Sequence, residues 1–176
     1  MFNISISLIA CVDENLGLGH ENKLLTHLPK DLAHFKRLTK GNICIQGRNT
    51  YESIMAYNNK PLPNRTNMLL TTQENYKAHP SVFVYNSMSD IQHEYYSYCD
   101  KDTEVFVIGG GELYRQFLPI ADYIYLTVIH HKFENVDTHF PQFLQDSRWM
   151  LQWEQRHMKD DKHRYDYSFR KYSLKH

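Results

Sequence analysis

An aspartate stands inside an apolar stripe near the start of a predicted helix. In HLPKDLAHFKRLTKG, one helix face carries Leu28, Asp31, Leu32, Phe35 and Leu38. A first-turn acid could simply favour the helix dipole at a wet edge. Alternatively, it is a lone carboxylate in an apolar pocket, held there to bind or protonate a ligand. The rest of the chain has to decide between these two interpretations.

A glycine-rich strand end could bind phosphate. In VFVIGGGELYRQFL, a buried strand runs into three glycines and then a helix start, where free N–H groups suit an anion. Tyr114 stands where a G-x-G-x-x-G fingerprint needs its last glycine. A plain tight turn is therefore an equal alternative.

Two more strand ends offer donors for phosphate. CIQGRNTYESI places Arg48 at a helix start directly after Gly47, where its guanidinium could hold a phosphate or remain solvated. NMLLTTQ ends in the hydroxyls of Thr71 and Thr72. In an open parallel sheet the carboxyl ends of strands meet at one edge, so these motifs reinforce one another.

Other reactive side chains give a weaker signal. In PLPNRT, Arg65 lies between a proline-stiffened turn and a strand, where it could bind a carboxylate bidentately or be an ordinary exposed arginine. His130, His131 and His139 lack metal-ligand spacing, so we expect no metal site. No Ser, Cys or Lys occurs in a recognisable nucleophile motif.

Strands alternating with helices must position these residues. Helices are predicted over Pro29–Lys40, after Gly47, from near Ser87 and after Gly111. Alternating aromatic residues from Trp149 to Leu174 predict a closing antiparallel hairpin. Strands are predicted at residues 4–12, 42–46, 67–72, 81–85, 103–109 and 122–129. This order predicts an α/β fold with a mostly parallel sheet covered on both faces.

Composition limits the class of ligand. The 176 residues suit one domain, and 20 basic against 20 acidic side chains give no net charge. We therefore expect a small-molecule ligand and neither nucleic acid nor membrane as partner. The N-terminus lacks a signal-peptide pattern, and no apolar run reaches transmembrane length. Three separated cysteines, Cys11, Cys44 and Cys99, suit reduced thiols in the cytoplasm.

Taken together, the motifs resemble dihydrofolate reductases. The resemblance covers residues 6–141 in order, from ISLIACVDENLGLG through LPKDLAHFK, GRNTYESI, PLPNRTNMLLTTQ and VIGGGELYRQFLPIADYIYLTVI to DTHFP. It implies one domain over residues 1–176, with an eight-stranded, mostly parallel sheet and four helices. It also implies NADPH-dependent reduction of 7,8-dihydrofolate to tetrahydrofolate, a role in one-carbon metabolism and antifolate sensitivity.

The resemblance also assigns the site. Asp31 becomes the only carboxylate in the pterin pocket, supported by Thr127, with Leu24 in the catalytic loop. Hydride passes from nicotinamide C4 to pterin C6 while N5 gains a proton, either relayed by Asp31 or delivered by water. The implied substrate-binding residues are Ile9, Ala10, Asp31, Leu32, Phe35, Ile54, Arg65, Ile108, Tyr114 and Thr127. The implied cofactor-binding residues are Ala10, Cys11, Leu18, Gly19, Asn22, Leu24, Gly47, Arg48, Asn49, Thr50, Leu70, Thr71, Thr72, Ile108, Gly109, Gly110, Gly111, Glu112, Leu113 and Tyr114.

Two departures from the family pattern matter. Leu25 and Thr26 replace the usual Pro-Trp pair, so we expect a gap near the pterin with room for one or two waters. The gap should weaken substrate binding or slow hydride transfer by a free energy on the order of 1 kcal/mol. Glu112 stands where some members carry an arginine, and it is either a benign helix-start acid or a charge that loosens NADPH.

Two other functions stay open. The same architecture could reduce another pterin-like or pyrimidine substrate with NADPH. Alternatively, the chain could bind folate or nucleotides without catalysis, for which the altered KLLTHLP loop is the best support. We expect a monomer in either case.

Overall fold

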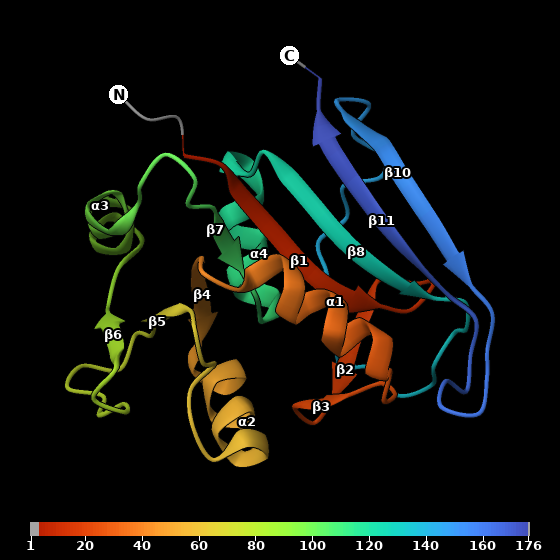
Figure 1. Ribbon diagram of the computed structural model, residues 1–176, viewed down its shortest axis with the longest axis horizontal. Helices are drawn as coiled ribbons and strands as arrows, with labels where there is room; N and C mark the ends of the chain where they lie inside the picture. Colours follow the sequence, from red (N-terminus) through yellow and green to blue (C-terminus); the bar gives the residue numbers. More distant parts are fainter. Residues whose placement is uncertain (1–3, 176) are drawn as a thin grey trace.

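An eight-stranded sheet organises residues 4–175, the part of the chain that this computed structural model describes (Figure 1). The six strands from β8 to β6 run parallel, whereas β10 and β11 are antiparallel additions. In spatial order the strands are β10 (Trp149–His157), β11 (Tyr167–Leu174), β8 (Tyr123–Ile129), β1 (Ile6–Val12), β7 (Val105–Val107), β4 (Ile43–Gly47), β5 (Thr66–Leu70) and β6 (Val82–Tyr85). The predicted mixed sheet and closing hairpin are confirmed.

Strand β1 shows why both sheet faces are buried. Its residues Ile6, Leu8, Ala10 and Val12 belong to the large hydrophobic cluster on one face, whereas Ile9 belongs to a smaller cluster on the other. Successive side chains of a strand point to opposite faces, so an unbroken apolar run needs cover on both.

Two helices cover each face. Helices α1 (Pro29–Thr39) and α2 (Arg48–Asn58) contribute to the smaller clusters, while α3 (Met88–Tyr98) and α4 (Gly111–Phe117) contribute to the large one. A short 3₁₀ helix, η1 (Leu118–Ile120), follows α4. The four predicted helices are confirmed. Among residues 4–175, no helix is long and apolar enough to cross a membrane.

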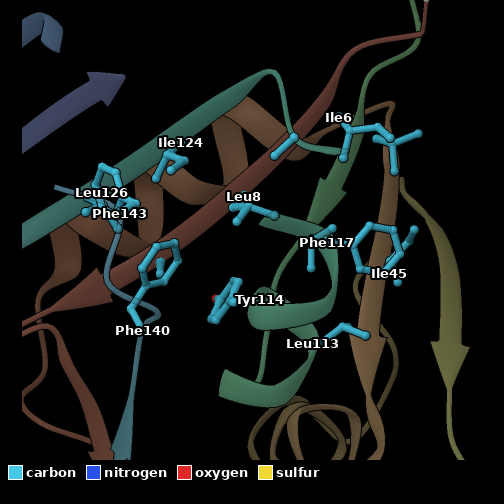
Figure 2. Packing of buried hydrophobic residues seen from close by; sticks show 14 of the residues in the cluster. Ile6, Leu8, Ile45, Leu113, Tyr114, Phe117, Ile124, Leu126, Phe140 and Phe143 are labelled. Atoms are coloured by element: carbon cyan, nitrogen blue, oxygen red, sulfur yellow. The ribbon is translucent and has the colours of Figure 1, made fainter. Parts of the chain in front are cut away.

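Aromatic side chains fill the large cluster between α4 and the sheet. Figure 2 shows Tyr114 and Phe117 of α4 turned toward Leu8 of β1 and Phe140. The rings of Tyr114 and Phe140 lie 4.9 Å apart, in a tilted arrangement. This packing fixes the glycine-rich start of α4 against the ends of the central strands.

A second, small sheet was not predicted. It consists of β3 (Lys23–Leu24), β2 (Gly17–His20) and β9 (Thr138–His139). Strands of two to four residues are too short for periodicity to reveal them. This sheet pairs the segment before α1 with the segment after β8.

A buried aspartate anchors that sheet to the main one. Asp13 follows β1, and its Oδ1 accepts hydrogen bonds from the backbone N–H groups of Asn15 (2.9 Å) and Gly17 (2.8 Å). Its Oδ2 accepts a third bond from the N–H of Phe133, at 3.0 Å. One carboxylate thus joins the end of β1, the start of β2 and the connection after β8.

Candidate active site

Helix α1 carries an apolar face that is partly accessible. Leu28, at its N-cap, is only 3 % exposed, but Leu32 is 39 % exposed and Phe35 is partly exposed. His34, outside the stripe, is buried instead and stacks on Phe169 of β11 at 4.0 Å between ring centroids. The stripe therefore does not simply pack into the core, and its accessible apolar surface suits a ligand.

Asp31 lies within this face, next to β8 and β1. Its Oδ1 accepts a hydrogen bond of 2.5 Å from the Thr127 hydroxyl, and the Cys11 thiol lines the same small cavity. Burial raises the pKa of Asp31 above its usual value, while the hydroxyl of Thr127 and the thiol of Cys11 oppose the shift. The surroundings favour the interpretation of a lone carboxylate held in an apolar pocket.

A cavity of about 20 Å³ adjoins the Asp31 carboxylate. Its lining consists of Cys11, Leu18, Leu24, Leu25, Thr26, Leu28, Asp31, Leu32 and Ile129. That volume holds one water molecule. The expected gap at Thr26 is therefore present but small, because the leucine side chains around it occupy most of the space. Asp31 is the only acidic side chain in this lining, within residues 4–175.

Arg65 lies beside the C-terminal end of α1. Its Nε donates to the carbonyl of Pro63 at 2.7 Å, and its Nη1 lies 3.4 Å from the Thr39 hydroxyl. Partial burial lowers the pKa of this guanidinium, which nevertheless stays charged at neutral pH. Thr39 follows Asp31 by eight residues, or ~12 Å along the helix axis.

The small hydrophobic cluster beside α1 and α2 forms an apolar wall. Ile9 and Ile108 are buried there, and Phe35, Leu38 and Ile54 pack against them. Helix α1 thus has a carboxylate in its first turn and a guanidinium beside its last residue, with apolar side chains between them. Such a surface suits a flat, elongated ligand with a basic ring system and a terminal carboxylate.

The strand ends meet as the sequence predicts. The N–H of Gly47, at the end of β4, donates to the carbonyl of Gly109 at 2.8 Å, and Gly47 also pairs with Leu70 of β5. Gly109 has φ +123°, and a Cβ there would lie 3.2 Å from the Tyr114 hydroxyl and 3.3 Å from Thr50 Oγ1. Only glycine fits this position, so the backbone forms the floor.

Two helix starts open toward these glycines. The N-cap residues are Gly47 for α2 and Gly110 for α4, and neither helix has a side-chain cap. Gly111 and Asn49 lie in the first turns. The uncapped N–H groups and the helix dipoles favour a bound anion such as a pyrophosphate.

Polar side chains also lie at the start of α2 and after the end of β5. The Nη1 of Arg48 bonds to Glu52 at 3.2 Å, and the Tyr76 hydroxyl donates to the same carboxylate at 2.9 Å. Thr72 is exposed beyond β5, while Thr71 is buried and its carbonyl accepts from Asn86 at 2.9 Å. The guanidinium is thus preoriented at the surface near the strand ends.

Three residues at the start of α4 have separate environments. Tyr114 is buried, and its hydroxyl donates to the carbonyl of Ile9 at 2.6 Å. The side chain of Leu113 points into the large cluster (Figure 2), so only its backbone can reach a ligand. Glu112 is exposed and paired with Arg115 at 2.5 Å, which lowers the pKa of the carboxyl and compensates its charge within the helix.

The loop with β2 and β3 closes the site from the side. The carbonyl of Asn22 accepts a hydrogen bond from Ser53 of α2 at 3.4 Å, and Leu18 lies near Gly111 of α4. Gly19 has a backbone carbonyl 2.4 Å from its ideal Cβ position, so it has no room for a side chain. Leu24 is 69 % exposed but also lines the cavity at Asp31.

Two residues at the site were not predicted from the sequence. Ile129 lines the cavity with Leu25 and Leu28, and Leu62 joins the apolar wall. Ala10 was assigned to both ligands, but its side chain belongs to the large cluster on the opposite sheet face from Ile9. Strand alternation could have revealed this for Ala10, whereas no local signal identifies the others.

Comparison with known proteins gives one consistent family. A family model described as dihydrofolate reductase matches residues 5–174. A dihydrofolate reductase from Bacillus subtilis is 42 % identical over 170 residues, covering 97 % of this chain and 95 % of that protein. One from Haemophilus influenzae is 37 % identical, covering 94 % and 96 %. The structure of dihydrofolate reductase from Enterococcus faecalis, complexed with NADP(H) and RAB-propyl, superposes with a TM-score of 0.85 at 33 % identity, covering 99 % of both chains.

Proposed function

Because this chain belongs to the dihydrofolate reductase family, we propose that its cleft binds 7,8-dihydrofolate beside NADPH, and that the residues around Asp31 promote reduction to tetrahydrofolate. The observation that carries this proposal is the Asp31 carboxylate, bonded to Thr127 within an otherwise apolar and accessible face. A dihydropterin presents an amino group and a ring nitrogen to a single carboxylate, and this geometry leaves that carboxylate free to accept both.

The residues at the strand ends fit NADPH. The φ of +123° at Gly109 disfavours any side chain there, and the uncapped starts of α2 and α4 offer N–H groups to a pyrophosphate. Arg48 and Thr72 offer a charge and a hydroxyl to the 2′-phosphate. When bound, NADPH supplies the hydride that reduces pterin C6.

The protein's own residues favour this reaction by electrostatics and alignment. Asp31 accepts hydrogen bonds from the pterin 2-amino group and N3, and Thr127 fixes the carboxylate in place. In a poorly hydrated cleft the negative charge stabilises the cationic, N5-protonated pterin. The apolar wall from Ile9 to Leu38 holds the rings in line and limits bulk water.

Arg65 recognises the other end of the substrate. Its contacts with Pro63 and Thr39 fix the guanidinium, leaving Nη2 and the outer face for the substrate's α-carboxylate. The ~12 Å of helix between Asp31 and Thr39 is spanned by the aromatic part of the molecule.

We further infer one domain over residues 1–176, acting as a cytoplasmic monomer. The main sheet that organises residues 4–175 supports a single domain, and the free thiols of Cys11, Cys44 and Cys99 suit a reducing compartment. Sedimentation equilibrium of the full chain tests the monomer.

The decisive assay measures dihydrofolate-dependent oxidation of NADPH by absorbance. Wild-type protein should turn over, and Asp31→Asn should lower the rate by roughly 10²-fold at neutral pH, the usual scale for removing a positioned acid–base group. Part of the activity should return at low pH, where more of the substrate is already protonated. Turnover only with a pyrimidine substrate, or tight folate binding without turnover, would replace the proposal by one of the two alternatives.

A further inference from the structure

The first turn of α1 contains an N–H group with no partner inside its own helix. Pro29, the first helical residue, has no N–H, and the N–H groups of Asp31 and Leu32 both donate to the carbonyl of Leu28, at 3.0 and 3.1 Å. Leu28 provides no side-chain cap. The N–H of Lys30, directly before Asp31, therefore needs an acceptor from elsewhere.

That acceptor comes from the turn between β10 and β11. The Nε2 of His163 lies 3.1 Å from the Lys30 nitrogen and accepts its hydrogen bond. The Nδ1 of the same ring lies 2.7 Å from Asp160 Oδ1. Because an ionised carboxylate only accepts, Nδ1 carries the proton and Nε2 keeps its lone pair for Lys30.

The imidazole is held rigidly in this orientation. His163 is 2 % exposed and stacks on the fully buried ring of Tyr167, with centroids 5.0 Å apart. The backbones of Asp160 and His163 exchange two hydrogen bonds, of 2.9 and 3.2 Å, and the N–H of Lys162 donates to Asp160 at 2.9 Å. The turn thus presents a fixed acceptor to the helix start, as a capping side chain does at its own helix.

We propose that His163 is a positioning residue: it caps α1 from the distant hairpin and thereby fixes Asp31 for dihydrofolate. This inference rests on the proposed function of Asp31. The cap acts on the peptide that precedes Asp31, and the Thr127 bond holds the side chain of Asp31 from the other side. Without the cap the first turn frays, and the carboxylate is no longer aligned with the pterin.

Charged neighbours of the cap come from both packed elements. Asp160, Asp161 and Lys162 surround His163 in the turn, and Lys30 lies across from it on α1. His157 of β10 also stacks on the Tyr167 ring, with centroids 5.0 Å apart. Substitutions should therefore change the acceptor without adding a charge.

The test compares His163→Leu, which removes the acceptor, with His163→Gln, whose side-chain carbonyl can still reach Lys30. Lys162→Ala, in the same turn, is the matched control. Stopped-flow hydride transfer, titration with dihydrofolate and titration with NADPH are measured on each. The Leu variant should lose roughly tenfold in hydride transfer or in dihydrofolate affinity, as for a lost helix cap, with NADPH affinity unchanged. The Gln variant should recover most of the loss, and Lys162→Ala should behave as wild type.

Hydrogen exchange at α1 gives a readout that does not depend on activity. Exchange in peptides covering residues 29–32 should accelerate in the Leu variant but not in the Gln variant or the control. Asp160→Ala removes the carboxylate that keeps the proton on Nδ1 of His163. If His163→Leu does not fold, Asp160→Ala should accelerate the same exchange by a smaller factor. Equal losses of NADPH and dihydrofolate affinity, or unchanged exchange, would overturn the proposal. Accelerated exchange in a protein without dihydrofolate turnover would refute the proposed function while keeping the cap.

Discussion

The ionised side chain of Asp31 is unfavourable for folding but serves the proposed chemistry. Its carboxylate is held by Thr127 in surroundings whose burial raises its pKa, so the charge that we propose to bind the pterin is unfavourable for folding. Sites of this kind exchange stability for function.

The pH dependence of stability follows from the direction of that shift. A folded-state pKa raised above the unfolded value means that the wild type loses stability as pH rises from the ordinary aspartate range through the raised pKa. Asp31→Asn should therefore be more stable than wild type at pH 7, on the order of 1 kcal/mol, with the difference vanishing in acid. Urea unfolding across pH measures this.

A half-buried acid at the surface provides the control for that series. The pKa of Asp146 is lowered by Arg148, so Asp146→Asn should show no stabilisation at neutral pH. A destabilised Asp31→Asn at pH 7 would contradict the cost assigned to the buried charge.

Arg65 allows a second test at the scale of one residue. Arg65→Leu should weaken dihydrofolate binding by roughly 10- to 100-fold, because a charge-assisted hydrogen bond contributes about 1.5–3 kcal/mol. A substrate analogue that lacks the terminal carboxylate should bind both proteins equally. Isothermal titration with both ligands measures the effect, and an equal loss for both would place the defect in the fold of the turn.

At the scale of elements, the loop before α1 belongs to a sheet of its own. Asp13 anchors it to β1 and to the connection after β8, while Asn22 and Leu18 reach α2 and α4. The loop is therefore positioned by contacts with elements distant in sequence. Leu25 and Thr26 at its end form one wall of the cavity beside Asp31.

The size of that cavity sets the expected effect of repairing the loop. A void of about 20 Å³, at ~24 cal/mol per Å³, corresponds to ~0.5 kcal/mol, or about a twofold change. This free energy is half of the ~1 kcal/mol that we expect from the sequence. Thr26→Trp combined with Leu25→Pro should tighten dihydrofolate binding about twofold, with Leu25→Pro alone as the control. A weaker affinity in the double variant would show that the leucines around the cavity leave no room for an indole.

At the scale of the whole molecule, the parallel sheet gathers the site at the carboxyl ends of its strands. Helices α1 and α2 cover one face and α3 and α4 the other, so strand ends from β1, β4, β5 and β7 meet between them (Figure 1). Ligands bound across these ends stabilise the whole fold by mass action.

Thermal unfolding should reveal the cofactor preference. NADPH at a free concentration of 100 times its Kd should stabilise the fold by about 2.7 kcal/mol, and NADH at the same concentration by less. Arg48→Ala should reduce the difference between the two cofactors, since the 2′-phosphate loses its cation. Arg148→Ala, an exposed arginine paired with Asp146, is the control. Equal shifts by NADPH and NADH in wild type would contradict the role of Arg48.

The sequence by itself determined the elements and most of the candidate site residues. Apolar alternation, glycine and proline positions and the stripe around Asp31 are local signals, and they identify the four helices and the main strands. The family motifs then assign residues on several of these elements to one cleft. The sequence also fixes how far apart these residues lie along the chain.

Tertiary structure alone decided which of these residues meet and what else joins them. The bond from His163 to Lys30 spans 133 positions, and that from Phe133 to Asp13 spans 120. The cavity at Thr26 is small because side chains from four separate segments converge on it. Such contacts depend on which elements pack together. The periodic pattern of one element shows that it packs, but it does not identify its partner.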